Sequence, residues 1–183
     1  MRRAAAILLV PVIIAAVVGT LWLLGRTSLE HSQDTVIKNA ADRYQVDPAL
    51  IKAVIWKESL FRPDVRGGAG ELGLMQLQEI AAQEWADAEQ LRPFNHNICL
   101  DPQTNVLAGT FYLAKLLKRY RDTDDAVPYA LADYNAGRSN VLKWNQGEAK
   151  TNSTAFIDQI GFPSTRQYVL DVMKRARRYR SQT

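Results

Sequence analysis

The segment from Lys57 to Gln76, KESLFRPDVRGGAGELGLMQ, contains a carboxyl group suited to acid or base chemistry and a glycine pattern typical of cofactor binding. Residues 68–73 read GAGELG, a formal G-x-G-x-x-G. This pattern cradles a dinucleotide pyrophosphate only when an apolar strand leads into it and a helix leaves it. The preceding residues 60–66, LFRPDVR, are not typical of a buried parallel strand. We therefore interpret the glycines as a tight turn, or as a close approach of the backbone to a ligand.

A helix is predicted to carry Glu58, the carboxyl group of this segment. Asp47 is a typical N-cap, and Pro48 suits the first helical position. The helix should stop before Arg62 and Pro63, because proline disfavours helix in the residue before it. Helical spacing puts Glu58 on the same face as four apolar residues: Leu50, Ile51, Val54 and Ile55.

The environment of Glu58 decides what its carboxyl group can do. Removal from water disfavours the anion and raises the pKa of a carboxyl group, so that the group can stay protonated near neutral pH and serve as a general acid. The alternative is an ordinary glutamate at a helix end, turned outward to Lys57 or Arg62. Periodicity alone leaves both interpretations open.

The cysteine and histidine content gives little support to a metal site or a hydrolase triad. Cys99 is the only cysteine, so an intramolecular disulfide is impossible and a zinc cluster would lack partners. His31 and His96 are the only histidines, and neither lies near a serine or cysteine in a recognisable hydrolase setting. Neither a metal centre nor a nucleophile triad is expected.

The N-terminal part of the chain is strongly apolar. Residues 4–24 contain no charged side chain, and a helix of that length spans roughly 30 Å of hydrocarbon. Arg2 and Arg3 precede the run, so the positive-inside rule predicts that the following chain is exported. We predict an inner-membrane, single-pass anchor in residues 1–26, a linker in 27–33 and a periplasmic domain in 34–183. A cleavable signal sequence is the alternative, although its apolar region is usually shorter.

The net charge of +4 arises at the two ends of the chain. Without Arg2, Arg3 and Arg26, 20 basic residues stand against 19 acidic ones, and without the five cations of residues 174–180 the numbers become 15 and 19. We therefore expect no nucleic-acid partner. The C-terminal cations could contact an anionic polymer or lipid head groups, or could complement the dipole of a terminal helix.

Hydrophobic periodicity predicts a mainly helical domain. Residues 34–44 show the amphipathic period of 3.6, and residues 104–120 carry a broad apolar face. No alternating β-branched run is long enough for a large sheet. The other predicted helices are Leu74–Trp85, Ala126–Tyr134, a short turn at Ser139–Trp144, and Thr165–Tyr179, with an irregular connection from Leu91 to Pro102.

Four short motifs occur in order along the chain: ESLFRP at 58–63, GLMQ at 73–76, ADYNAG at 132–137 and TRQYV at 165–169. In order and spacing they resemble the catalytic domain of the soluble-type lytic transglycosylases of bacterial cell walls. The segment DPQTNV at 101–106 also matches, and the similarity covers roughly residues 40–180. The resemblance implies a lysozyme-like, goose-type α+β fold that is mainly α with little β. It also implies a cleft for the glycan strands of peptidoglycan.

The resemblance further implies that Glu58 is the single catalytic residue and needs no metal or cofactor. As an acid it would protonate the oxygen between N-acetylmuramic acid and N-acetylglucosamine, while the 2-acetamido group of the substrate stabilises the positive charge at C1. As a base it would then take the proton of the C6 hydroxyl, which attacks C1 and leaves a 1,6-anhydro end. The residues implied in substrate binding are Ser59, Glu71, Met75, Gln76, Tyr134, Asn135 and Tyr168.

Four of these residues are expected in specific roles beside the acid. Met75 would offer an apolar platform to a sugar, with plain core packing as the alternative. Gln76 would supply a hydrogen-bonding group. The Tyr134 hydroxyl and the Asn135 amide would lie beside the acid and the acetamido group, and the alternative for Tyr134 is a buried hydroxyl satisfied locally.

Three residues depart from the usual pattern of this family. Glu71 puts a second carboxylate at the cleft rim, where it would raise the pKa of Glu58 by repulsion or position a water for hydrolysis. Asp133 replaces a usual alanine, and Ser164 stands where a glutamate is common. The alternative functions are a hydrolytic muramidase and a non-catalytic peptidoglycan-binding module of an envelope complex. An envelope protein that localises the enzyme is a further candidate partner.

Overall fold

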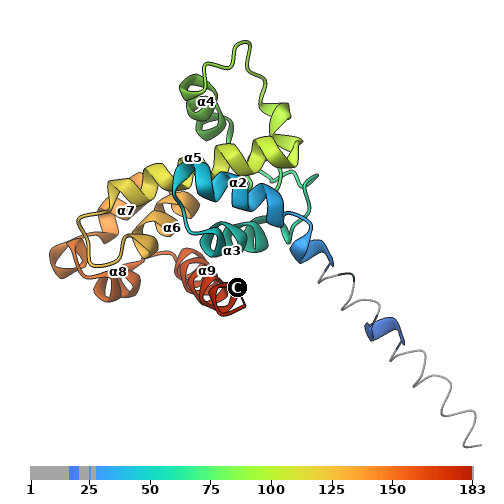
Figure 1. Ribbon diagram of the computed structural model, residues 1–183. Helices are drawn as coiled ribbons and strands as arrows, with labels where there is room; N and C mark the ends of the chain where they lie inside the picture. Colours follow the sequence, from blue (N-terminus) through green and yellow to red (C-terminus); the bar gives the residue numbers. More distant parts are fainter. Residues whose placement is uncertain (1–16, 21–24, 26–27, 183) are drawn as a thin grey trace, which may run out of the picture.

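The computed structural model describes residues 17–20, 25 and 28–182, which form a helical domain. In Figure 1, α5 (Pro102–Arg119) crosses the middle of the domain, with α4 (Glu79–Ala88) above it and α9 (Pro163–Arg180) below it. The remaining elements are α2 (Asp34–Tyr44), α3 (Pro48–Ser59), the 3₁₀ helix η1 (His96–Leu100), α6 (Ala126–Ala136), α7 (Arg138–Trp144), the 3₁₀ helix η2 (Gly147–Lys150) and α8 (Ser153–Gln159).

Helix α3 begins as the sequence predicts. The Asp47 side chain accepts a hydrogen bond of 2.8 Å from the backbone of the first turn, and Pro48 takes the first helical position. The helix ends at Ser59, because Leu60 and Phe61 both adopt left-handed backbone angles, with φ of 53° and 63°. The last turn therefore stops abruptly beside the loop that follows.

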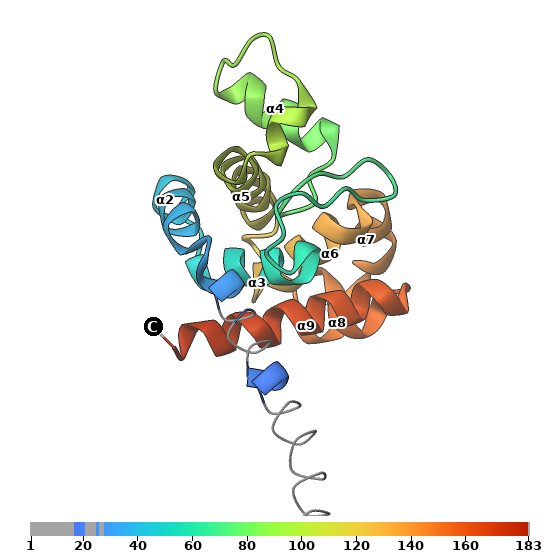
Figure 2. The ribbon, with the colours of Figure 1, turned by 90° about the vertical axis from the view of Figure 1, so that its right-hand side faces the viewer.

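The hydrophobic core surrounds α3. In both views α3 lies between α5 and α9 (Figures 1 and 2), and α9 packs along α3 and α6 while α5 packs against α2, α4 and α6. From Leu50 to Ile55, every side chain except Lys52 is at most 2% exposed. Burial on several sides stabilises this helix mainly through apolar contacts. It also holds the last turn, with Glu58, at the edge of the core.

The helix predicted for Leu74–Trp85 begins only at Glu79, so the first five residues of that prediction were wrong. Two backbone hydrogen bonds of 3.0 Å join Leu72 and Leu77 and close a tight turn there. Leu74 is fully buried in this turn. The apolar pattern that suggested a helix therefore reflects the burial of a loop.

The connection predicted to be irregular from Leu91 to Pro102 contains the 3₁₀ helix η1, and no helix was predicted where η2 and α8 occur. Helix α8 is short and is capped by Asn152, whose side chain accepts hydrogen bonds from the backbone amides of Thr154 and Ala155. Helix α2 has the predicted bounds, and α5, α6, α7 and α9 agree with their predictions to within two residues at each end. The prediction of a mainly helical domain is confirmed.

Within the described residues, β structure is limited to two isolated bridges, which pair Arg66 with Leu72 and Leu72 with Leu77. Of the helices in these same ranges, none is long and apolar enough to cross a membrane. The anchor predicted for residues 4–24 falls largely outside the described residues.

Candidate active site

A cavity of about 540 Å³ opens beside the last turn of α3. Its walls come from the loop between α3 and α4, from α4 and α5, and from the C-terminal end of α6. Carboxylates, amides and apolar side chains share the surface. The lining residues are Glu58, Glu71, Gln76, Leu77, Gln78, Ile80, Ala81, Glu84, Tyr112, Asp133, Tyr134, Asn135, Ala136 and Gly137.

Glu58 lies at the apolar end of this cavity. The pKa of its carboxyl group is raised from 4.5 to about 7, mainly by burial and also by the negative charge of Glu71. The Tyr168 hydroxyl donates a hydrogen bond of 2.6 Å to Glu58 Oε1 and acts in the opposite direction, as does the more distant charge of Lys57. The carboxyl group can therefore change its protonation state near neutral pH.

The outward-facing alternative for Glu58 does not occur. Lys57 Nζ instead donates to Asp171 on α9 at 2.8 Å, and Arg62 Nε donates to the Ser59 carbonyl at 3.2 Å. Both candidate cations are therefore bound to other groups. Glu58 has a tyrosine as its hydrogen-bond partner, and of the two interpretations that periodicity left open the structure supports the one in which the carboxyl group is largely removed from water.

Tyr168, and not Tyr134, donates a hydrogen bond to Glu58, which differs from the sequence expectation. Tyr168 projects from α9, is only 5% exposed and does not line the cavity, so it positions Glu58 rather than contacting a ligand there. Tyr134 lines the cavity, but its hydroxyl donates to the Met75 carbonyl at 2.7 Å. Burial, with the nearby charge of Glu58, raises the pKa of both tyrosines well above the ordinary value. Both hydroxyls stay protonated as donors.

The glycine-rich loop forms a turn at the cavity rim. Gly73 has a φ of 73°, and a Cβ atom there would lie 2.4 Å from Asn105 Nδ2 and 2.5 Å from the Cys99 carbonyl oxygen. The Glu71 carboxylate accepts a hydrogen bond of 3.0 Å from the Ala69 backbone amide. Backbone hydrogen bonds of this kind lower the pKa of Glu71. The loop amide thus binds the Glu71 carboxylate of the chain itself. Glu71 is the second acidic group that was predicted at the rim, and it lines the cavity.

The expectation that Met75 forms a platform for a sugar was wrong. Its side chain is fully buried, and a Cβ atom added at Gly109 would lie only 2.4 Å from Met75 Sδ. Met75 therefore packs in the core against α5. Its backbone contributes instead, because the amide donates to Asn105 Oδ1 at 2.8 Å and the carbonyl accepts from Tyr134.

Gln76 and Asn135 line the cavity as expected, whereas Ser59 does not. The Gln76 amide nitrogen donates to the carbonyls of Val65 and Gly73, at 3.1 and 2.9 Å, which orients the side chain. Asn135 is exposed at the rim. Ser59 is 2% exposed, and its hydroxyl donates to the Ile55 carbonyl within α3, so it has no surface for a ligand.

Asp133 is a second buried carboxylate in the cavity wall, but it has a cationic partner. Arg119 donates to Asp133 Oδ2 at 2.5 Å, and the Tyr120 hydroxyl donates to the same oxygen at 2.7 Å. Burial of the guanidinium lowers the pKa of Arg119, but the hydrogen bond to Asp133 and its charge outweigh this effect and raise the pKa. The three residues form a closed group that keeps its charges balanced.

Sequence reasoning missed two contributors to this site. Asn105 is fully buried on α5, and its amide holds the loop by donating to the carbonyls of Leu72 and Cys99 at 2.8 and 2.6 Å. A polar amide within the apolar face of a predicted helix was the available signal. Ile80 lines the cavity with 76% of its surface exposed and is an apolar side chain available to a ligand. It lies in the part of the predicted helix that is correct, but no contact with a ligand was predicted for it.

The sequence model of the Transglycosylase SLT domain family matches residues 35–157. The chain belongs to this family. Over 109 residues it is 38% identical to the membrane-bound lytic murein transglycosylase F of Desulfosudis oleivorans, covering 58% of this chain and 22% of that protein. Over 161 residues it is 26% identical to the soluble lytic murein transglycosylase of Escherichia coli K12, covering 87% and 24%.

Two solved structures share the fold of this SLT domain. The 70-kDa soluble lytic transglycosylase in complex with bulgecin A has a TM-score of 0.76 and 26% identity, over 92% of this chain and 27% of that one. An inactive glutamate-to-glutamine mutant of Slt from Pseudomonas aeruginosa has a TM-score of 0.72 and 27% identity, over 80% and 23%. The chain spans about a quarter of the length of the relatives that it matches.

Proposed function

We propose that this protein is a peptidoglycan lytic transglycosylase that cleaves the β-1,4 bond between N-acetylmuramic acid and N-acetylglucosamine and leaves 1,6-anhydro ends. The observation that carries the proposal is the state of Glu58. Its pKa of about 7 in a cavity wall lets one carboxyl group act first as an acid and then as a base. Membership of the SLT family and the names of the lytic murein transglycosylase relatives support the choice of substrate.

The mechanism begins with Glu58 protonated. Its proton passes to the glycosidic oxygen as the bond to C1 breaks, and the 2-acetamido oxygen of the substrate stabilises the charge that develops at C1. Glu58, now ionised, takes the proton of the C6 hydroxyl while that oxygen bonds to C1. No water is consumed, and Glu58 returns to its protonated state. The Tyr168 hydroxyl bond keeps the carboxyl oriented through both proton transfers.

The side chains on the other walls of the cavity would bind the glycan. A sugar ring offers apolar C–H faces and many hydroxyl groups. Ile80 supplies an exposed apolar contact on α4, and the amides of Gln76, Gln78 and Asn135 supply donors and acceptors. We propose these side chains as substrate contacts in place of Met75 and Ser59. Glu71 acts on Glu58 through its charge.

The products of purified sacculi test this proposal. The full-length protein should release muropeptides with 1,6-anhydro ends, detected by mass spectrometry, whereas a muramidase would release ordinary reducing ends and a binding module would release nothing. Glu58→Gln should lower the release by about 10³-fold, within the range of general acid and base catalysis. Glu148→Gln, which changes an exposed carboxylate on η2, is the matched control and should keep full activity. Equal release by the Glu58→Gln and wild-type proteins would refute the role of Glu58.

We also propose that the enzyme acts at the periplasmic side of the inner membrane, anchored once through residues 4–24. The uncharged stretch of that length and the preceding Arg2 and Arg3 support this location. We include in this proposal an envelope protein that localises the enzyme. Purification from membranes solubilised in mild detergent tests both points. Recovery of the intact chain in the soluble fraction without detergent would contradict the anchor.

A further inference from the structure

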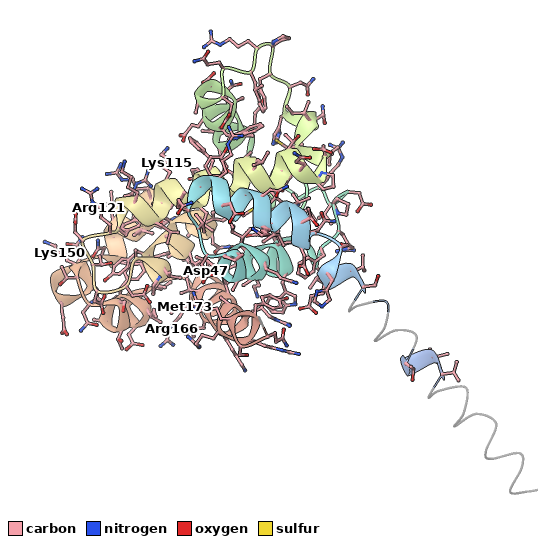
Figure 3. All side chains as sticks on the ribbon, in the orientation of Figure 1. Asp47, Lys115, Arg121, Lys150, Arg166 and Met173 are labelled. Carbon is pink, nitrogen blue, oxygen red and sulfur yellow. The ribbon has the colours of Figure 1, made fainter. Side chains whose placement is uncertain are left out.

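The C-terminal half of α9 carries a cationic face that the proposed catalytic site does not use. Lys174, Arg177 and Arg178 are exposed and recur at spacings of three and four residues, which puts them on one side of the helix. The opposite side, with Val172 and Ala176, is buried at no more than 2% exposure. The three cations therefore point away from the domain, and Figure 3 shows nitrogen-tipped side chains extending outward there.

The acidic groups at this end of the domain already have cationic partners. Glu30 accepts from Arg175, Asp34 pairs with Lys52, Asp47 pairs with Arg180, and Asp171 pairs with Lys57. No ion pair of Lys174, Arg177 or Arg178 is found within residues 28–182. The charge of Lys174 also acts on Asp171, whose ion pair is with Lys57. The positive charge of Lys174, Arg177 and Arg178, here called the α9 cationic face, therefore remains available to an external anion.

The α9 cationic face lies beside the point where the chain enters the domain. A helical turn at residues 28–31 docks on α9 because Glu30 accepts hydrogen bonds from the Tyr179 hydroxyl and from Arg175, the latter at 3.5 Å. The Arg175 guanidinium also stacks 4.1 Å from the centroid of the Trp56 ring on α3. In Figures 1 and 2, α9 and the entering chain occupy the same end of the domain.

The docked turn at residues 28–31 is close along the chain to the uncharged segment, residues 4–24. Glu30 follows Leu24, the last residue of the uncharged run, by six positions. These six steps span roughly 9 Å as a helix and at most about 20 Å fully extended. If residues 4–24 cross a membrane, the docked turn must lie close to the lipid head groups, whose layer is roughly 5–7 Å deep on each side. The α9 cationic face would then lie within about two Debye lengths of the surface.

We propose that the α9 cationic face binds the head groups of anionic phospholipids and thereby fixes the orientation of the catalytic domain over the membrane. Basic residues next to a membrane-spanning segment are attracted to such lipids, and each contributes separately. The face is at the opposite end of α9 from Tyr168, which contacts Glu58, so lipid contact leaves the cavity open. This inference rests on the proposed membrane anchor.

The chemical reactivity of one lysine tests the proposal in the full-length protein. The protein is placed in nanodiscs of phosphatidylcholine alone, or of phosphatidylcholine with phosphatidylglycerol, and its amines are acetylated with a water-soluble reagent. Lys174 should react several-fold more slowly in the anionic discs, and the difference should disappear at high salt. Lys150, exposed on η2 away from the C-terminal part of α9 and labelled in Figure 3, is the internal control and should react equally in both.

A charge-reversed protein separates lipid contact from other causes. Arg177→Glu combined with Arg178→Glu should abolish the difference at Lys174 and leave the cleavage of soluble glycan fragments unchanged. Equal reactivity of Lys174 in both lipids, with the protein incorporated in both, would overturn the lipid proposal alone. Protection of Lys174 by peptidoglycan fragments in neutral discs, without protection by phosphatidylglycerol, would assign the face to a wall polymer instead. Failure of the protein to incorporate in either disc would overturn the anchor and this inference together.

Discussion

Two carboxyl groups in the wall of the same cavity have opposite surroundings. Asp133, at the end of α6, is 2% exposed, and Arg119 and Tyr120 both donate to it. Glu58, at the end of α3, receives one bond from the Tyr168 hydroxyl, and its pKa is raised to about 7 mainly by burial. Asp133 has a guanidinium as a partner, whereas the hydrogen bond that Glu58 accepts comes from a neutral hydroxyl.

Loss of the Arg119 charge should make Asp133 resemble Glu58. Arg119→Met would leave a buried carboxylate with a tyrosine donor and no cation, and should lower the free energy of unfolding by about 3 kcal/mol at pH 7.5. Urea denaturation of the variant and wild-type proteins measures the loss.

The double variant with Arg119→Met and Asp133→Asn is the control for this prediction. It removes both charges and should recover part of the stability lost in the single variant. An equal loss in the single and double variants would mean that packing and not charge explains the effect.

Tyr168→Phe should lower kcat/KM by about ten-fold, which corresponds to one hydrogen bond of about 1.4 kcal/mol. Activity requires protonated Glu58 and therefore falls as the pH rises through its pKa. Because the Tyr168 bond lowers that pKa, its removal should move the alkaline limb of the pH–rate profile to higher pH. A lower rate with an unmoved limb would show that Tyr168 matters for packing only.

Glu71→Gln should have the smallest effect and the opposite sign. The negative charge of Glu71 raises the pKa of Glu58, so its removal should move the alkaline limb to lower pH, by less than about one unit. Glu79→Gln, an exposed carboxylate on α4 that does not line this cavity, serves as the control. A shift to higher pH in Glu71→Gln would contradict the electrostatic account.

Features of the site that depend on interactions between nearby residues could be predicted from the sequence. The cap at Asp47 predicted the start of α3, and helical spacing put Glu58 on the apolar face with two orientations left open, of which the structure shows the partly buried one. The glycine stretch failed the requirements of a cofactor loop and proved to be a turn. Both results depend on interactions within a few residues, which spacing along the chain encodes.

The partners of the carboxyl groups could not be predicted from spacing. Tyr168 reaches Glu58 across 110 residues of sequence, and nothing in its own helix distinguishes a hydrogen bond to Glu58 from a contact with substrate. Met75 was misplaced for a related reason. A methionine beside a glycine suits either a core or a surface, and the small residue Gly109 on α5 decides for the core. Such choices are made by tertiary packing.

Direct titration of the Glu58 carboxyl group tests the central claim. Carbon-13 NMR of protein labelled at glutamate carboxyl carbons, with Glu58→Gln used for assignment, follows the group from pH 3 to 9. We predict a midpoint close to 7, because burial without a cationic partner disfavours the anion. A midpoint near 4.5, the ordinary value, would contradict the account, since Glu58 would then be ionised at neutral pH and unable to serve as the acid.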